Sequence, residues 1–352
     1  MAAATLAVGA LTLAACSSSP AAVKKPKTTT TVVPVTAQPQ LCPLTGQPAP
    51  GGVIPQRPAL AIKVDNYSAA RPQSGLDRAD IIFEEPVEGG ITRYVAVFQC
   101  QNAPMVGPIR SARNIDIGIL TQFGQPLLVH VGGINPVIAN IAASPLINLD
   151  LGNYGLVIVH PPGRYAPFDT YASTTALWGL RADDQTVPAP IFTYSSTVPT
   201  GTAVTSVVIP FSGDAPVVWL YNPTNKLFMR YYGPEPDLLN NGHQNAAANV
   251  IVQTVDVTYG PWLENAEGGL EVQAQLSGTN GPLKVFRDGV EIDGIWQRSG
   301  AADPTQLLDS GGHPIALQPG PTWVELVPST VNVTVATATP PPSPGSSTTA
   351  SG

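Results

Sequence analysis

The sequence predicts an α+β protein, with a mixed α/β N-terminal domain followed by an antiparallel β-rich C-terminal domain. Before residue 182, strand-like apolar runs alternate with helix-like segments, which is typical of mixed α/β folds. After residue 202, short strand-like runs are separated by frequent turn sequences, which is typical of antiparallel sheets. The 33 glycines and 38 prolines are too many for a helical bundle or a coiled coil.

Composition excludes two further classes of protein. Hydrophobic residues make up 43% of the chain, so it can bury a core and is not disordered throughout. Charged residues make up only 12%, and the 24 acidic residues outnumber the 17 basic ones. Nucleic-acid binding needs clustered lysine and arginine, so we expect no nucleic-acid partner.

The N-terminal domain is predicted at residues 41–182. Strands are expected at Leu60–Val64, Ile81–Phe83, Thr92–Phe98 and Leu127–Val129. Ser111 is a good N-cap for a helix that reaches Phe123, where Gly124 ends it. A second helix is expected from Pro136 to about Ala143, and a weaker one from Ser173 to Leu180.

The C-terminal domain is predicted at residues 203–328, after a connection at 183–202. Its expected strands are Val204–Pro210, Val217–Tyr221, Leu227–Tyr232, Asn249–Thr258, Leu270–Ser277, Leu283–Arg287 and Trp323–Val327. Turn sequences such as Asp288-Gly289 separate them. Four tryptophans lie here, at positions 219, 262, 296 and 323, and we expect them in the core rather than on a sugar-stacking face.

Both ends of the chain lie outside these domains. Residues 1–16 have the length of a signal peptide, and Leu13-Ala14-Ala15-Cys16 resembles the bacterial lipobox, in which the cysteine carries lipid. Residues 17–40 are rich in Ser, Thr and Pro and predict a disordered tether. The uncharged residues 329–352 predict a disordered tail. We therefore expect a protein on the extracytoplasmic face of the membrane, held there by a lipid anchor.

Two cysteines remain after Cys16, at positions 42 and 100. An even pair in an exported chain is more often a disulfide than a metal site, so we predict a Cys42–Cys100 bond. It would hold the start of the globular part against the end of the strand Thr92–Phe98.

Several sequence blocks carry a resemblance to a known family. They include Arg57–Asn66, Ala70–Leu76, Ala79–Glu84, Pro86–Arg93 and Val106–Arg113, with further blocks around Trp296 and Trp323. Over roughly residues 42–328 the chain resembles the YerB-like family of bacterial lipoproteins, whose two parts are domains of unknown function. The resemblance implies export, a lipid anchor and a mixed α/β fold, but no reaction. It also leads us to expect a His-Asn pair after Ala166-Pro167, where this chain has Phe168 and Asp169.

The candidate ligand-binding residues are polar groups at strand ends and turns of the N-terminal domain. They are Asp65, Asn66, Arg71, Glu84, Glu88, Arg93, Arg110, Arg113 and His130. Most basic residues here are arginines, which suit fixed contacts to carboxylate or phosphate. These groups can form a buried network that holds loops around the sheet, or a cleft that binds an anionic or sugar ligand.

Catalytic and metal motifs are missing from the sequence. The four histidines form no HxxxH, HxH or HxxE pattern, and there is no CxxC, nucleophile elbow or phosphate-binding loop, so we expect no metal and no cofactor. The sequence favours a non-catalytic binding or scaffold module near peptidoglycan or its synthesis machinery, with an envelope protein or peptidoglycan as partner. The alternative is an envelope polymer hydrolase, similar to a glycosidase, that uses a pair from Asp65, Glu84, Glu85 and Glu88.

The lipid anchor can be tested at Cys16. We expect Cys16→Ser to abolish lipidation and to move the chain from the membrane fraction to the soluble fraction, because no other cysteine follows a lipobox-like sequence. Metabolic labelling with a fatty acid and membrane fractionation measure the two effects. Unchanged processing and fractionation of this variant would show that the anchor is not at Cys16.

Overall fold

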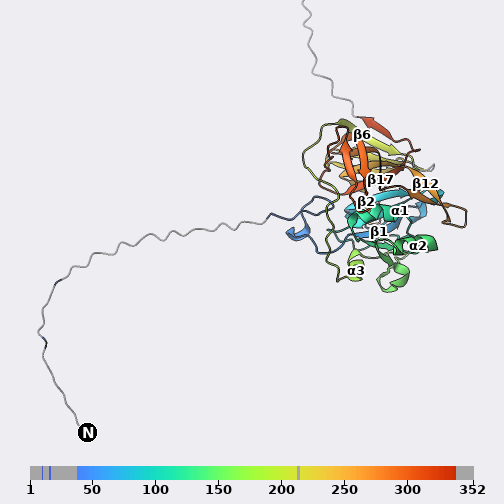
Figure 1. Ribbon diagram of the computed structural model, residues 1–352, viewed down its shortest axis with the longest axis horizontal. Helices are drawn as coiled ribbons and strands as arrows, with labels where there is room; N and C mark the ends of the chain where they lie inside the picture. The colour runs from blue at the N-terminus through green and yellow to red at the C-terminus, as the bar shows by residue number, and fades with distance from the viewer. Residues whose placement is uncertain (1–9, 11–15, 17–37, 212–214, 338–352) are drawn as a thin grey trace, which may run out of the picture. The chain divides into compact units, whose positions relative to one another are not determined.

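The computed structural model describes residues 10, 16, 38–211 and 215–337, and the described residues from Pro39 onward form one compact unit (Figure 1). Most of the predicted signal peptide, residues 17–37 of the predicted tether and residues 338–352 of the predicted tail lie outside the described residues. Among the described residues, every helix is too short or too polar to cross a membrane.

The N-terminal half has five strands and three short α-helices. The strands are β1 (Leu60–Asp65), β2 (Ile81–Pro86), β3 (Thr92–Phe98), β4 (Leu127–His130) and β5 (Ile147–Asp150). The helices are α1 (Ile115–Leu120), α2 (Asn135–Ala142) and α3 (Thr174–Gly179). The Ser173 hydroxyl accepts a hydrogen bond from the Ala176 backbone N–H at 3.1 Å, and it therefore caps α3.

In the described residues of the C-terminal half, all the regular elements are strands. They are β6 (Thr202–Ile209), β7 (Val217–Asn222), β8 (Leu227–Tyr232), β9 (Glu235–Pro236), β10 (Ala246–Ala247), β11 (Asn249–Val255), β12 (Val257–Leu263), β13 (Leu270–Ala274), β14 (Thr279–Arg287), β15 (Val290–Arg298), β16 (Gln306–Asp309), β17 (Thr322–Pro328) and β18 (Thr334–Thr337). The described chain is thus mostly β with some α, a coarser description than the α+β class that the sequence predicted.

One large sheet joins the two halves, in the order β10-β8-β7-β6-β15-β14-β11-β17-β2-β3-β1-β4-β5. The junction is the parallel pair β17–β2, in which Glu325 lies opposite Glu84. Strands β12 and β13 form a separate two-stranded hairpin. The predicted boundary between the halves is therefore crossed by a hydrogen-bonded pair of strands.

Three expected segments differ from the structure. The single strand expected at Asn249–Thr258 is divided between β11 of the large sheet and β12 of the separate hairpin. The helix expected from Ser111 begins only at Ile115, because the preceding backbone is bonded to β1 and to the segment after β4. The Arg110 N–H donates to the Lys63 carbonyl and the Ala112 N–H to the Gly132 carbonyl. The tail expected from residue 329 contains strand β18, which pairs with β6. Its Thr and Val side chains favour an extended backbone, and this preference outweighs the uncharged composition that predicted disorder.

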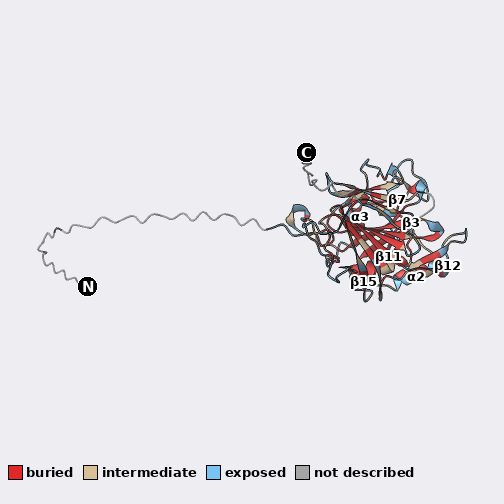
Figure 2. Ribbon diagram, turned by 90° about the horizontal axis from the view of Figure 1, so that it is seen from above, coloured by how far each residue is buried: buried red, intermediate tan, exposed pale blue. Residues whose placement is uncertain are grey.

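The central strands are covered on both faces (Figure 2). On one face, Ile62 and Val64 of β1 pack in a core with Trp219, Trp323 and α3. On the other face, Ala61 of β1 packs in a core with residues of α1 and α2. Trp219, Trp296 and Trp323 are buried, which confirms their expected place in the core, and Trp262 is half-buried.

Cys42 and Cys100 are bonded to each other, as the sequence predicted, across a sequence separation of 58 residues. Both cysteines are buried in a small cluster with Ala49. The bond therefore holds the segment before β1 against the residues that follow β3.

We expect the double substitution Cys42→Ala, Cys100→Ala to lower the free energy of unfolding by about 2 to 5 kcal/mol, because it frees a long loop in the unfolded chain. Urea denaturation of the oxidised protein and of the variant measures the difference. The wild-type protein under reducing conditions is the control and should match the variant. Equal stability of all three samples would contradict a stabilising bond.

Candidate functional site

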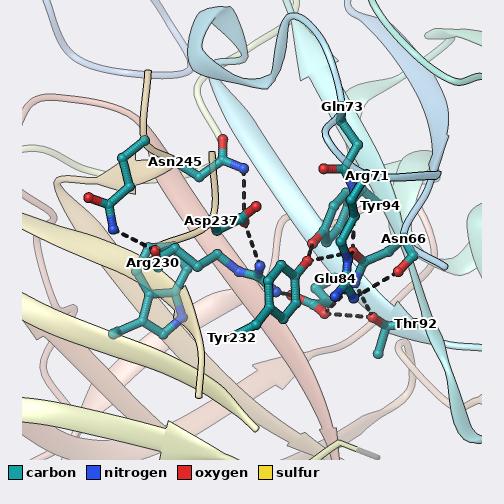
Figure 3. Close-up of polar contacts among 12 residues, drawn as sticks. Asn66, Arg71, Gln73, Glu84, Thr92, Tyr94, Arg230, Tyr232, Asp237 and Asn245 are labelled. Atoms are coloured by element: carbon teal, nitrogen blue, oxygen red, sulfur yellow. Dashed lines mark hydrogen bonds and ion pairs between the residues drawn. The ribbon is translucent and has the colours of Figure 1, made fainter. Parts of the chain in front are cut away.

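A buried arginine from the C-terminal half lies against the N-terminal strands (Figure 3). Arg230 of β8 donates from Nη2 to Glu84 Oε2 at 2.7 Å and from Nη1 to Asp237 Oδ2 at 2.6 Å, and its side chain is fully buried. Burial alone would lower the pKa of Arg230, but Glu84 and its other neighbours hold that pKa well above the usual value. We call Arg230, Glu84, Asp237 and Glu325 the Arg230 cluster.

Aromatic rings enclose the Arg230 guanidinium. The distances from its carbon to the ring centroids are 4.6 Å for Tyr232, 5.0 Å for Trp323, 5.5 Å for Tyr94 and 5.8 Å for Trp219. At these distances the ring faces attract a desolvated cation. The rings therefore add to the two carboxylates in stabilising the buried charge.

Glu325 of β17 is the third carboxyl group of the cluster. Its Oε1 accepts a hydrogen bond from Trp219 Nε1 at 2.7 Å. Burial, and then the nearby charge of Glu84, raise the pKa of Glu325 well above its usual value. This favours the neutral form, so that Arg230 faces two charged carboxylates rather than three.

A chain of hydrogen bonds leads from this cluster to the surface. Glu84 Oε1 accepts from Thr92 Oγ1 at 2.6 Å and from Asn66 Nδ2 at 3.2 Å. Asn66 Oδ1 in turn accepts from the Tyr232 hydroxyl at 2.5 Å and from Arg71 Nε at 3.3 Å. The Arg71 guanidinium lies 3.4 Å from the Tyr232 ring centroid. These side chains line a small cleft of about 70 Å³.

The opposite face of the sheet carries a second network, the Glu88 cluster of Glu88, Arg93, Arg113 and Glu264. Arg113 Nε donates to Glu88 Oε2 at 3.0 Å, and Arg93 Nη2 donates to Glu88 Oε1 at 3.4 Å. Burial alone would raise the pKa of Glu88, but Arg113 and Arg93 lower it below the usual value. Glu88 reaches these arginines from a turn in which Gly89 and Gly90 have φ angles of 76° and 71°, which suit glycine.

Glu264 enters this network from the end of the β12–β13 hairpin. Its Oε2 lies 3.4 Å from Arg113 Nη1, and its side chain is only 1% exposed. Burial raises the pKa of Glu264, and the neighbouring Glu88 raises it further, although Arg113 opposes both. The same hairpin places Glu271 against Asn114, which donates to its Oε1. The hairpin is therefore attached to the N-terminal half through acidic side chains.

Three further ion pairs lie on this face. Arg110 Nε donates to Asp65 Oδ2 at 2.8 Å, and the Arg110 side chain is 30% exposed. Lys63 Nζ donates to Glu85 Oε1 and, at 2.8 Å, to Asp116 Oδ1, and we call these three residues the Lys63 cluster. All three side chains are fully buried. Burial, and then the charge of Asp116, raise the pKa of Glu85 to about 8.

His130 lies apart from these networks. Its Nδ1 is 2.9 Å from the Gly132 carbonyl oxygen and its Nε2 is 2.7 Å from Asn148 Oδ1. The ring is fully buried. Both ring nitrogens thus have partners within the fold, and the imidazole faces neither the small cleft nor the Glu88 cluster.

An open groove lies beside the small cleft. It runs between the turn Glu88–Gly90 and the β12–β13 hairpin, has a volume of about 350 Å³, and is lined by apolar side chains such as Val87, Tyr259, Leu270 and Val331. Tyr259 is 68% exposed and Leu270 is 42% exposed. Ile91 and Thr92 line both the groove and the small cleft, so the two are continuous. We call this feature the β12–β13 groove.

The structure divides the nine predicted site residues among several places. Asn66, Arg71 and Glu84 line the small cleft, whereas Glu88, Arg93 and Arg113 form the Glu88 cluster. Asp65 and Arg110 form a separate pair. The prediction did not include Arg230, Tyr232, Asp237, Glu264 or Glu325. One sequence pattern could have identified Arg230 as a buried residue. It lies two positions after Phe228 in β8, and the period of two in a strand places both side chains on the same, buried face.

Each carboxylate of the hydrolase alternative has a cationic partner. Asp65 is bound by Arg110, Glu84 by Arg230, Glu85 by Lys63 and Glu88 by Arg113. A glycosidase needs two carboxyl groups that face a substrate across a cleft. The described residues also contain no group of three or more His, Cys, Asp or Glu side chains that could hold a metal ion.

Comparison with known proteins identifies relatives of this chain. Residues 44–187 match the model "Protein of unknown function (DUF3048) N-terminal domain", and residues 207–324 match the corresponding C-terminal domain. The chain is 28% identical over 305 residues to "Putative lipoprotein YerB" of Bacillus subtilis (strain 168), an alignment that covers 84% of this chain and 88% of that protein. The crystal structure of YerB protein from Bacillus subtilis has the same fold, with a TM-score of 0.71 and 21% identity, and the match covers 84% of this chain and 99% of the other.

The Arg230 cluster provides a test of stability. We expect Arg230→Met to lower the free energy of unfolding by about 3 to 5 kcal/mol, because it leaves Glu84 and Asp237 buried without a cation. The matched control is Lys284→Met, which removes a cation that also contacts two carboxylates but is partly exposed. We expect the control substitution to lower the free energy of unfolding by less than about 1 kcal/mol. Equal losses in urea denaturation would contradict a special role for the buried arginine.

Proposed function

The chain belongs to the YerB-like family of proteins with DUF3048 N- and C-terminal domains, and from this premise we propose that it is a lipid-anchored, non-catalytic binding or scaffold module of the cell envelope. Cys16, the proposed lipidation site, is exposed. The name of the Bacillus relative includes the word lipoprotein, which supports the same anchor. The lipid would hold the compact unit on the extracytoplasmic face of the membrane.

The binding role rests on one observation: the candidate carboxylates are paired with cations, whereas the β12–β13 groove is open and apolar. The four carboxylates proposed for hydrolysis are each held by a cation of the protein, whereas a glycosidase needs two carboxyl groups that face a substrate across a cleft. The β12–β13 groove, in contrast, presents exposed apolar side chains beside the polar small cleft. A concave apolar surface with a few polar groups at one end is typical of a binding site.

The groove suits a ligand that combines sugar rings or apolar groups with carboxylates. Tyr259 offers an exposed aromatic ring for stacking, and Arg71 at the neighbouring cleft offers a guanidinium for a carboxylate. Peptidoglycan presents sugar rings and peptide carboxylates close together. We therefore place peptidoglycan first among the partners, ahead of an envelope protein, and the cations that hold the four carboxylates argue against the hydrolase alternative.

Co-sedimentation with purified peptidoglycan tests this proposal. We expect the chain from Pro39 onward to sediment with peptidoglycan, and Tyr259→Ala to weaken that binding by about tenfold, the effect of losing one central aromatic contact. Tyr165→Ala is the matched control, because Tyr165 is 79% exposed but does not line the groove. Both variants should keep the wild-type melting temperature.

Two results would contradict the proposal. The first is equal sedimentation of the wild type and both variants, or none at all, which would remove peptidoglycan as the groove's ligand. The second is release of new reducing ends from peptidoglycan by the wild-type chain, which would favour the hydrolase alternative.

A further inference from the structure

The Lys63 cluster places an amine against two carboxyl groups in a site closed to solvent. Lys63 of β1 contacts Glu85 of β2 and Asp116 of α1, and the three side chains have no exposed surface. Neither the proposed binding role nor the small cleft uses these residues. The cluster therefore needs its own explanation.

A lysine at this position is chemically different from its basic neighbours. Lys63 is the only lysine between positions 41 and 182, a region in which all the other strongly basic residues are arginines. Arginine offers five N–H donors and suits a structural contact to two carboxylates better than lysine does. An arginine cannot lose its proton, whereas a buried lysine can do so and then act as a nucleophile. Among these strongly basic side chains, Lys63 is thus the one that can lose its proton and react.

The two carboxyl groups around Lys63 have different surroundings. Asp116 Oδ2 accepts the Arg113 backbone N–H at 2.8 Å, while Asp116 Oδ1 contacts Lys63 Nζ. Glu85 Oε2 is buried and has no hydrogen-bond partner among the described residues. Because its pKa is raised to about 8, Glu85 carries a proton at neutral pH. Asp116 is therefore placed to receive an attack, and Glu85 is placed to move protons.

We propose that Lys63 and Asp116 form an intramolecular isopeptide bond, with Glu85 as the catalytic acid and base. Lys63 first gives a proton to the Asp116 carboxylate, which leaves a neutral amine beside a neutral carboxylic acid. The Nζ lone pair attacks Asp116 Cγ, and the N–C bond forms while the carbonyl oxygen takes up negative charge. The Arg113 backbone N–H is positioned to stabilise that oxygen.

The intermediate then collapses to an amide. Glu85 first gives its proton to the departing hydroxyl group, so the C–O bond breaks and one water leaves, and the Glu85 carboxylate then accepts a proton from Nζ. Glu85 ends in its starting protonation state, and no oxidant, reductant or other reactant takes part. Exclusion of solvent favours the amide, since water is the other product and would reverse the reaction.

The bond would join strand β1 to helix α1 across 53 residues of sequence. The Cys42–Cys100 disulfide closes a loop of similar length around the same strands. Unlike the disulfide, an amide is not opened by reducing agents. The isopeptide bond would thus keep the N-terminal half cross-linked under conditions that break the disulfide.

The test is the intact mass of the chain from Pro39 onward, measured after complete reduction of the disulfide. We expect the wild type to be lighter than its sequence by one water, and tandem mass spectrometry to find a peptide in which Lys63 is joined to Asp116. Lys63→Met and Glu85→Gln should each have the full mass, because the first removes the nucleophile and the second the proton relay. Lys226→Met, which removes an exposed lysine, should keep the loss of water.

A wild-type chain of full mass would overturn the proposal, whatever the variants show and whether or not they fold. Loss of water at any other pair of residues would overturn it as well. A Lys63–Asp116 link that persists in Glu85→Gln would overturn the role assigned to Glu85.

Discussion

The structure depends on one constraint: charged side chains on strands that are covered on both faces must find their counter-charges inside the protein. Strands β1, β2, β3 and β17 lie in the middle of the sheet, and Lys63, Glu84, Glu85, Arg93 and Glu325 on these strands are buried. An isolated buried charge would be very costly. The surrounding loops, helix α1 and the β12–β13 hairpin supply the partners, and so these charges determine which segments pack against each face.

The Arg230 cluster also makes the two halves depend on each other. Arg230 and Asp237 come from the C-terminal half and Glu84 from the N-terminal half, while β17 pairs directly with β2. Two family models describe the chain, but neither half alone would satisfy these groups. Separation would leave Glu84 without its arginine and would leave unpaired the edge of β2 that faces β17, although β2 would keep β3 on its other side. The two matched regions are therefore parts of one folding unit.

Local patterns in the sequence predicted most of the strands and the presence of polar residues at the candidate site. They did not predict which charged side chains pair with each other. Ser173 and Pro136 marked two helices correctly, because capping and proline effects act within one turn. Ser111 does not begin a helix, because backbone hydrogen bonds from Arg110 and Ala112 to distant segments fix the conformation of the chain there. Glu84 and Arg71 were found as polar groups at strand ends. Arg230 was missed because its partner lies 146 residues away, a distance over which spacing carries no information.

The need to pair buried charges also determines which side chains remain available to contact a ligand. Glu88 and Arg113 satisfy each other inside the protein, so their charges are not free to bind a ligand. The turn that holds Glu88 nevertheless forms one wall of the β12–β13 groove, and Glu264 holds the hairpin that forms the other. The buried charges therefore act on the groove indirectly, by fixing the distance between its walls. Exposed side chains such as Tyr259 are then left to make the contacts with a ligand, supported by a rigid and internally neutralised base.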